Sequence, residues 1–189
     1  AISPSNVCFS AAVSACEKGN RWQLGLALFW AMPARCVEAD VINYNAAISA
    51  CEKAGQWQLA LCLLDDMPLH ALAPDLVGMN AAISACGRGS RWQAGIWLFH
   101  DLGRRGLEPL ASSCGAAVGA CHRGRQWPMA LALLRQAPVR DEYAFSSAIS
   151  ACEKAGRWDL ALGLLEDMAS SQLPPTAISR NAAISACEK

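Results

Sequence analysis

A six-residue segment returns along this chain at an almost constant interval, and no other feature limits its possible fold as strongly. It reads Ser-Ala-Cys-Glu-Lys-Gly at residues 14–19 and recurs in related forms to the end of the chain. Its cysteines stand 35 residues apart, except for one step of 31: Cys16, Cys51, Cys86, Cys121, Cys152 and Cys187. A tryptophan keeps the same register, at Trp22, Trp57, Trp92, Trp127 and Trp158. A period near 35 predicts a stacked array in which each unit buries its apolar face against its neighbours.

These two markers divide the 189 residues into five units and a fragment. We expect residues 1–5 to be the tail of a preceding unit, and residues 177–189 to be a partial sixth unit. The expected complete units are 6–40, 41–75, 76–110, 111–141 and 142–176, of which the fourth is short. Because the chain begins and ends inside a unit, we expect it to be part of a longer protein.

Apolar residues within one unit follow helical spacing. In the second unit the first stripe, spaced by three and four residues, is Tyr44, Ala47, Ile48 and Cys51. Asn43 precedes this stripe and is expected to cap the helix. After Gly55 a second stripe follows, formed by Trp57, Ala60, Leu61, Leu64 and Met67. Each unit is therefore predicted to be a hairpin of two helices, and the whole chain to be all-α with no sheet.

Composition excludes several classes of protein. Sixteen basic and sixteen acidic residues cancel, so net charge alone does not indicate a nucleic-acid partner. No apolar run is long enough to span a membrane. Equivalent cysteines on stacked helices should lie about 8–10 Å apart, beyond the limit of about 7 Å for a disulfide, so we expect buried, unbridged thiols. No Cys-x-x-Cys or His-x-Glu pattern occurs, and we expect no catalytic residue, metal or cofactor.

The residues from Val41 to Ile48, followed by Lys53-Ala54-Gly55, Met67 and Pro74-Asp75, resemble the consensus of the pentatricopeptide repeat family. The 35-residue period is the family's own, and a 31-residue variant is known in it. The related tetratricopeptide repeat has 34 residues and carries glycine where Ile48 stands here. The resemblance covers nearly the whole chain. It implies a right-handed superhelical solenoid that binds single-stranded RNA, one base per unit.

In that family the fifth and the last residue of a unit read the base. The pairs that the resemblance implies here are Ser10 with Asp40, Asn45 with Asp75, Asn80 with Leu110, Gly115 with Asp141 and Ser146 with Thr176, and Asn181 is the fifth residue of the partial unit. By the family's code, the Asn45 pair implies uracil and the Ser10 pair implies guanine. Leu110 and Gly115 depart from the pattern, and the Ser146 pair corresponds to no base that we can assign.

Two further sets of residues repeat with the units. The family's second residue contacts each base from the side, which here implies Val7, Ile42, Val77, Tyr143 and Ile178, with Ser112 in the fourth unit. Basic residues recur near the end of each first helix and are expected to contact phosphates: Lys18, Lys53, Arg88, Arg123, Lys154 and Lys189. Alternatively they are only solvated surface charges, since a glutamate precedes four of them.

The remaining aromatic and histidine residues give weaker signals. We expect the repeated tryptophans to pack rather than to stack on bases, because they begin the apolar stripe of the second helices. Trp30 and Trp97 lie outside the register and have no assigned role. The three histidines share no spacing and are expected on the surface or in loops: His70, His100 and His122.

We therefore expect a protein that binds single-stranded RNA selectively without catalysing a reaction, away from membranes, and in a chloroplast or mitochondrion as the resemblance implies. Two alternatives stay open. A protein-binding helical scaffold is favoured by the weak base-reading positions and the zero net charge, and the chain could also be the targeting part of a larger RNA-modifying enzyme. Polar fifth residues and the basic stripe on one surface would favour RNA, whereas an apolar groove there would favour the scaffold.

Overall fold

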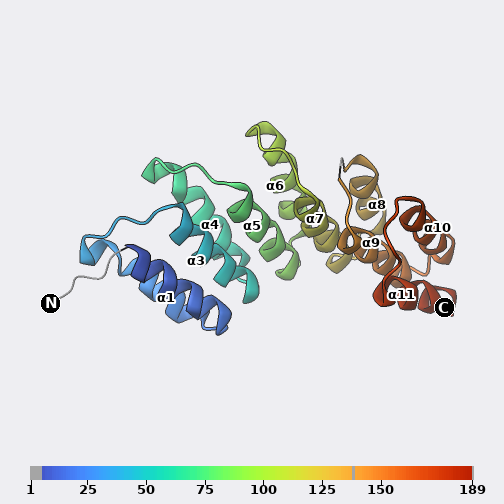
Figure 1. The fold of residues 1–189 in the computed structure, drawn as a ribbon, viewed down its shortest axis with the longest axis horizontal. Coiled ribbons are helices and arrows are strands. Elements are labelled where there is room, and N and C mark those ends of the chain that lie inside the picture. Colours follow the sequence, from blue (N-terminus) through green and yellow to red (C-terminus); the bar gives the residue numbers. More distant parts are fainter. Residues whose placement is uncertain (1–5, 138, 189) are drawn as a thin grey trace. The chain divides into compact units, whose positions relative to one another are not determined.

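The computed structural model describes residues 6–137 and 139–188, and within them the protein is an all-α helical repeat fold, as predicted (Figure 1). No strand occurs in these residues. The helices are α1 (Asn6–Lys18), α2 (Trp22–Trp30), η1 (Pro33–Arg35), α3 (Val41–Lys53), α4 (Trp57–Asp66), η2 (Met67–His70), α5 (Leu76–Arg88), α6 (Trp92–Arg104), α7 (Ala111–Arg123), α8 (Trp127–Gln136), α9 (Glu142–Lys154), α10 (Trp158–Ser170) and α11 (Ala177–Cys187), where η marks a short 3₁₀ helix. The expected tail at residues 1–5 and the expected phosphate contact Lys189 lie outside the described residues.

The chain forms two compact units, one ending at Gly89 and one beginning at Ser90. In the N-terminal unit, α1, α3 and α5 lie side by side (Figure 1, blue to green). A second layer covers them, because α2 packs on α1 and α3 while α4 packs on α3 and α5. The C-terminal unit repeats this plan: α7, α9 and α11 form one layer, α8 packs on α7 and α9, and α10 packs on α9 and α11. We call the two layers the first helices and the second helices.

Small side chains bring the first helices close together. The predicted stripe of α3 is buried completely, and Ala46 and Ala50 between its members are buried as well. Leu63, Leu64 and Met67 of the covering second helix complete this part of the core. Close-packed interiors tolerate few voids, so a layer built on alanine and cysteine requires neighbouring helices at short range.

The repeated cysteines are unbridged, and all ten cysteines of the chain are free thiols. Cys51, Cys86, Cys121 and Cys152 are buried, as predicted. Burial raises the pKa of Cys51 to about 11, so it stays a neutral thiol at physiological pH. The expectation was wrong for Cys187, which is exposed, and for Cys16, which is only half-buried. Its helix α1 packs against α2 and α3 on one side and has no described hairpin on the other.

Two of the repeated tryptophans pack on a glycine of the next hairpin. A Cβ atom added at Gly89, just after α5, would collide with the ring of Trp57, and one added at Gly124, just after α7, would collide with Trp92. The indole therefore lies directly against backbone, which confirms the packing role of these two tryptophans. Glycine is needed at these sites for space and not for conformation, because the left-handed backbone falls on the following residues, Ser90 and Arg125.

The start of the first helices differs from the prediction by three residues. Helix α3 begins at Val41, and its N-cap is Asp40, whose Oδ1 accepts from the backbone N–H of Asn43 at 2.9 Å. Asn43 is the third residue of the helix and returns the bond, since its Oδ1 accepts from the backbone N–H of Asp40 at 2.9 Å. Such a reciprocal pair is a capping box. None of the helices that the structure describes is long and apolar enough to cross a membrane.

Candidate functional site

The last residue of most units caps the following first helix. Asp40, Asp75, Asp141 and Thr176 are the N-caps of α3, α5, α9 and α11, and each side chain accepts from the backbone N–H three residues further on. This bond satisfies an amide that the helix leaves without a partner. It also holds the carboxylate or hydroxyl in one orientation beside the first turn of the helix. The expected base-reading groups are therefore positioned before any ligand arrives.

Asn45 and Asp75 meet in the way that the resemblance implies. The Nδ2 atom of Asn45 lies 3.0 Å from both carboxylate oxygens of Asp75, whose Oδ1 also accepts from the backbone N–H of Gly78 at 2.9 Å. The Oδ1 atom of Asn45 is buried, and no hydrogen-bond donor among the described residues reaches it. It is turned toward Gly78, where an added Cβ would come within 2.5 Å of it. The amide is thus oriented from two sides by the next hairpin.

Ser10 and Asp40 are linked through a third residue. The hydroxyl of Ser10 accepts from Nδ2 of Asn43 at 2.7 Å and donates to the carbonyl oxygen of Asn6 at 3.1 Å. Asn43 in turn forms the capping box with Asp40. The first pair is therefore brought together indirectly, with the fully buried Asn43 between its members.

Ser146 and Thr176 line a groove in the C-terminal unit. Their hydroxyl oxygens are 3.2 Å apart. The groove has a volume of about 580 Å³, and Tyr143 and Ile178 form its apolar sides. Arg140 and Glu142 add charged groups at its rim. One groove is thus lined by the second, fifth and last residues of one expected unit and by the second residue of the next.

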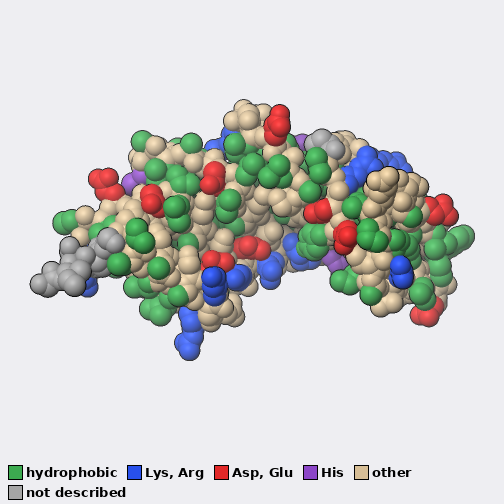
Figure 2. All heavy atoms as spheres, viewed as in Figure 1, with side chains coloured by type: hydrophobic (Ala, Val, Ile, Leu, Met, Phe, Trp, Pro, Cys, Tyr) green, Lys and Arg blue, Asp and Glu red, His purple; other side chains and the backbone are tan. Residues whose placement is uncertain are grey.

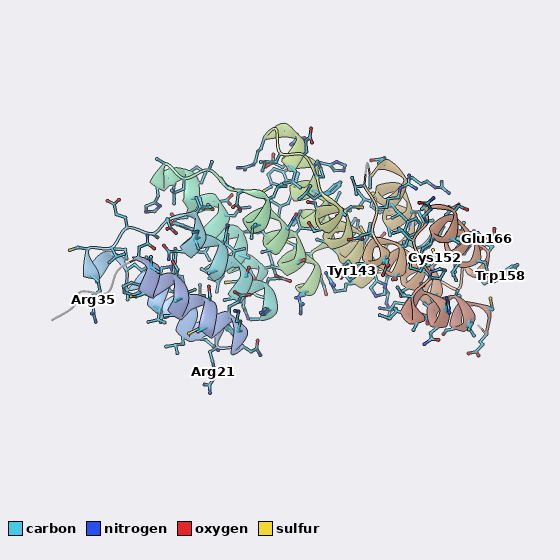
Figure 3. All side chains as sticks on the ribbon, viewed as in Figure 1. Arg21, Arg35, Tyr143, Cys152, Trp158 and Glu166 are labelled. Carbon is cyan, nitrogen blue, oxygen red and sulfur yellow. The ribbon has the colours of Figure 1, made fainter. Side chains whose placement is uncertain are left out.

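The fourth unit differs because its fifth residue is glycine. A Cβ at Gly115 would lie 2.8 Å from Cδ1 of Tyr143 and 3.5 Å from a carboxylate oxygen of Asp141. The tyrosine ring, labelled in Figure 3, occupies the place that a fifth side chain would take. Gly115 therefore offers no polar group, but it allows Tyr143 to lie close to α7.

Apolar side chains at the second position of the first helices are exposed to solvent. Each of the five expected base-clamping residues is more than half exposed: Val7, Ile42, Val77, Tyr143 and Ile178. Isolated exposed apolar residues are common and need no explanation. Here, however, the same position is exposed in successive hairpins of each compact unit, so these side chains are accessible to a ligand.

The other expected base-reading residues occupy equivalent places. Asn80 is half-buried in α5, and Asn181 is exposed in α11. Leu110 precedes α7 and is exposed; its backbone N–H donates to Oγ of Ser113 at 3.2 Å. The side chain of Leu110 has no polar atom, so it cannot hydrogen-bond a base edge.

Third residues of the first helices support the fifth residues, and the sequence reasoning missed them. They are buried in α3, α5, α7, α9 and α11: Asn43, Gly78, Ser113, Ala144 and Ser179. Asn43 bonds Ser10, and Gly78 faces Asn45, in each case across the boundary between two hairpins. The sequence could have indicated these positions by the size of their side chains, because none of the five carries a large one.

Basic residues of the N-terminal unit are partly neutralised. Nζ of Lys53 lies 3.1 Å from Oε1 of Glu17, and Nε of Arg88 lies 3.7 Å from Oε1 of Glu52. Each glutamate comes from the preceding first helix, so the pairs form a ladder between hairpins. Figure 2 shows acidic and basic side chains adjoining along the lower edge of this unit. Lys18 is exposed. The alternative interpretation, a solvated face, thus gains support for Lys53 and Arg88.

The C-terminal unit replaces the glutamate of this ladder with a histidine. Nζ of Lys154 lies 3.3 Å from Nε2 of His122. Burial, together with the charges of Lys154 and Arg123, lowers the pKa of His122, so its ring is neutral at pH 7 and accepts this bond. Nε of Arg123 is buried, and no acceptor within the described residues bonds it. Lys154 and Arg123 therefore keep more of their charge available to an anion than Lys53 does.

Stacked two-helix hairpins with regularly placed caps define an α-helical repeat protein. The chain belongs to the pentatricopeptide repeat family: the profile of the pentatricopeptide repeat domain matches residues 27–89, and that of the PPR repeat matches residues 77–107 and 143–173. No curated protein sequence matches the chain. Within the described residues, no three His, Cys, Asp or Glu side chains are arranged to hold a metal ion.

Solved structures of the same fold include two plant proteins. PPR10 from maize has 24% identity and a TM-score of 0.77 over 94% of this chain. Its complex with an 18-nucleotide psaJ RNA element has 28% identity and a TM-score of 0.70 over 93%. In both cases the match spans 26% of PPR10, so this chain covers about a quarter of that protein. The PPR domain of Arabidopsis thaliana protein-only RNase P 1, solved with tRNA, has 12% identity and a TM-score of 0.76 over 95% of this chain and 96% of that domain.

Proposed function

We propose that the chain binds single-stranded RNA selectively, with bases held at the first turns of its first helices. Membership of the family supports this, as do the RNA and tRNA in the solved complexes of PPR10 and RNase P 1. In each site a base would lie between the second residues of successive hairpins and face the fifth and last residues. Its edge would be read by these polar groups, and its faces would be covered by apolar ones.

The groove around Ser146 and Thr176 is the observation that carries this proposal. A nucleobase has apolar faces and a polar edge, and the groove has apolar sides, Tyr143 and Ile178, with two hydroxyls in its lining. Both hydroxyls donate and accept hydrogen bonds, so the groove tolerates more than one base. We infer that this site holds a base firmly by stacking and discriminates between bases weakly.

The Asn45 site is proposed as the best reader of sequence. Its amide and the Asp75 carboxylate are already held together at 3.0 Å. The amide oxygen has no donor, and an unsatisfied buried acceptor costs about 1–3 kcal/mol. A base N–H that draws this oxygen outward therefore gains energy. All four bases carry an N–H on the pairing edge, so this oxygen favours binding and does not by itself select the base. A preference for uracil, the family's assignment for this pair, is consistent with the N–H on its pairing edge.

Phosphates are proposed to meet the basic residues near the ends of the first helices, of which Arg123 is half-buried and the others are exposed: Lys18, Lys53, Arg88, Arg123 and Lys154. We further infer a role without catalysis in the processing or expression of RNA in a chloroplast or mitochondrion. The family resemblance supports the organelle, and the solved relatives are plant proteins. A fluorescent fusion of the complete protein, imaged beside organelle markers, tests the location.

The test of RNA binding uses two exposed aromatic residues of one unit. Tyr143 lines the groove and is 54% exposed, whereas Trp158 begins the second helix α10 and is 56% exposed. Both are labelled in Figure 3. RNA retained from a random pool is sequenced to find a binding site, and its affinity is then measured for Tyr143→Ala and Trp158→Ala. The first variant should lose about 1–3 kcal/mol, the value of one stacked base, and the second should lose almost nothing. Equal effects of the two substitutions, or no enrichment from the pool, would favour the protein-binding scaffold.

A further inference from the structure

The N-terminal unit contains a cavity that is separate from the proposed RNA site. It has a volume of about 730 Å³ and lies between the end of α2, the connector before α3, and the end of α4. Trp30 and Phe29 line it from α2, Glu38 from the connector, and Asp66 and His70 from α4 and η2. Among the residues that the structure describes, no lysine or arginine lines it. Trp30 and His70 are two of the residues to which the repeat pattern assigns no role.

A carboxylate and two neighbouring rings form the polar wall of this cavity. The hydroxyl of Tyr44 donates to Oδ2 of Asp66 at 2.7 Å, and Nδ1 of His70 lies 3.5 Å from the same oxygen. Burial and the bond to Asp66 raise the pKa of Tyr44, so the phenol remains a donor. Both contacts engage Oδ2, and the carboxylate is 40% exposed. Its other oxygen can therefore accept a hydrogen bond from a ligand.

Aromatic side chains also line the cavity. Trp30 is 57% exposed although it is the largest side chain of the cavity, while Phe29 below it packs edge-on against Tyr44 with ring centroids 4.8 Å apart. An aromatic face beside a carboxylate, with no lysine or arginine among the described lining residues, attracts a cation. Since Glu38 adds a second negative charge, the cavity as a whole favours a cationic ligand.

The next hairpin shows which cation fits this carboxylate. Asp101 stands 35 residues after Asp66, and Arg105 stands 35 residues after His70. There Nε of Arg105 donates to Oδ2 of Asp101 at 2.6 Å, and the carboxylate is only 11% exposed. In this one hairpin the carboxylate at the register position of Asp66 thus holds a guanidinium of the chain itself. Histidine at that place leaves Asp66 open. Arg35, the arginine of this connector, lines a different groove and points away from the protein (Figure 3).

We propose that this cavity binds an arginine side chain carried by a segment of a partner protein. A guanidinium would bond Asp66 on one side and lie against the ring of Trp30 on the other. Arginine suits such a site better than lysine because its planar group stacks on aromatic rings and loses less hydration. The volume of about 730 Å³ far exceeds a guanidinium and leaves room for the residues that flank it. The site is distinct from the base-reading residues, so the protein could hold RNA and the partner together.

The experiment titrates the isotope-labelled protein with acetyl-Gly-Arg-Gly-amide and follows its tryptophan indole signals by NMR. The twin peptide carries citrulline, which has the same shape without the charge. Trp30→Ala identifies the signal of Trp30. We expect the arginine peptide to shift this signal and the citrulline peptide to bind at least tenfold more weakly. Asp66→Asn, which keeps an acceptor for Tyr44, should weaken binding of the arginine peptide at least fivefold.

Matched controls separate this cavity from general surface charge. Asp65→Asn removes the neighbouring exposed carboxylate, and Trp97→Ala removes a tryptophan that is 55% exposed on another second helix. Both should bind the arginine peptide as the unaltered protein does. Equal binding of the two peptides, or unchanged binding by Asp66→Asn, would overturn the proposal. If arginine amide alone bound as tightly as the peptide, the site would belong to a small cation and not to a partner segment. None of these readouts involves RNA, so the result is independent of the proposed function.

Discussion

Asn45 illustrates how the candidate interface works at the scale of single residues. Its amide nitrogen is bound by Asp75, and its amide oxygen faces Gly78. Asp75 is itself fixed because it caps α5. One side chain therefore depends on a cap and on a glycine that both belong to the next hairpin. Under the proposed function, discrimination between bases would depend on this arrangement as much as on the identity of the fifth residue.

Replacing Asn45 with serine changes the reading group and leaves its neighbours in place. The new pair with Asp75 would copy that of Ser10 and Asp40, for which the family's code implies guanine. We expect preference at this one base to move from uracil toward guanine by about 1–3 kcal/mol, the range of a good base-edge contact in DNA. Stability should fall by about 1 kcal/mol, because the bond to Asp75 is lost. Competition between RNAs that differ only at this base measures the shift, and equal weakening for all bases would show that Asn45 reads nothing.

Gly78 gives a sharper test, since it belongs to no expected reading pair. A methyl group added there would come within 2.5 Å of the Asn45 amide oxygen, and this oxygen is the far end of a movable side chain. In Gly78→Ala we expect Asn45 to turn away and discrimination at its base to fall roughly tenfold, or about 1.4 kcal/mol. The fold should persist, because alanine favours a helix over glycine by about 1 kcal/mol. The same competition assay applies, and an unchanged base preference would contradict the supporting role of the third residue.

At the scale of helices, the spacing of apolar residues predicted the buried face correctly, whereas the candidate capping residue predicted the wrong start. The spacing of Tyr44, Ala47, Ile48 and Cys51 correctly indicated the buried face of α3, because a helix of 3.6 residues per turn brings these positions together. The start of α3 was predicted three residues too late, because Asp40 and Asn43 are both residue types that commonly cap a helix. Only the backbone shows that each bonds the other. The half-buried Cys16 was also missed, since burial in an array depends on neighbours and not on the repeated residue itself.

The contact of Trp57 with Gly89 predicts opposite effects of one substitution at two glycines. In Gly89→Ala the new methyl group would collide with the indole, so we expect a loss of about 1–3 kcal/mol of unfolding free energy from overpacking. Gly163 lies in α10 with no atom within 4 Å of an added Cβ. There the substitution should stabilise by up to about 1 kcal/mol through helix propensity. Urea denaturation measures both, and a destabilisation of equal size at Gly163 would show that the indole contact is not the cause.

The candidate site was predictable in its positions but not in its contacts. The family resemblance, carried along the repeat register, led to Tyr143, Ser146, Thr176 and Ile178, and these four residues line one groove. The register could not show that Tyr143 fills the space beside Gly115, because that contact depends on which rotamer the ring adopts. Nor could it reveal the cavity beside Trp30, because Trp30 and His70, which help to line it, have no counterpart in the repeat pattern. Residues that depart from the repeat pattern cannot be aligned by it, so only the structure shows that they lie close together.

At the scale of the whole molecule, the net charge is zero, but the basic residues differ in whether an acidic side chain pairs with them. Lys53 and Arg88 each face a glutamate of the preceding hairpin, whereas Lys154 faces a neutral histidine. Exposed ion pairs contribute only about 0–1 kcal/mol to stability. Their larger effect would be on the affinity for RNA, because a lysine that is paired with a carboxylate is less available to a phosphate. The salt dependence of binding reports this difference directly.

Releasing Lys53 should therefore strengthen RNA binding. In Glu17→Gln the lysine loses its charged partner at 3.1 Å and can contact a phosphate instead. We expect tighter binding at low salt, and a plot of log K against log salt that is steeper by up to about 0.7, the value of one added contact on a single strand. Glu166→Gln makes the same charge change on the second helix α10, labelled in Figure 3, and serves as the control. If both substitutions strengthened binding equally, net charge alone would be responsible. If Glu17→Gln changed neither affinity nor slope, Lys53 would be a solvated surface residue that does not touch the RNA.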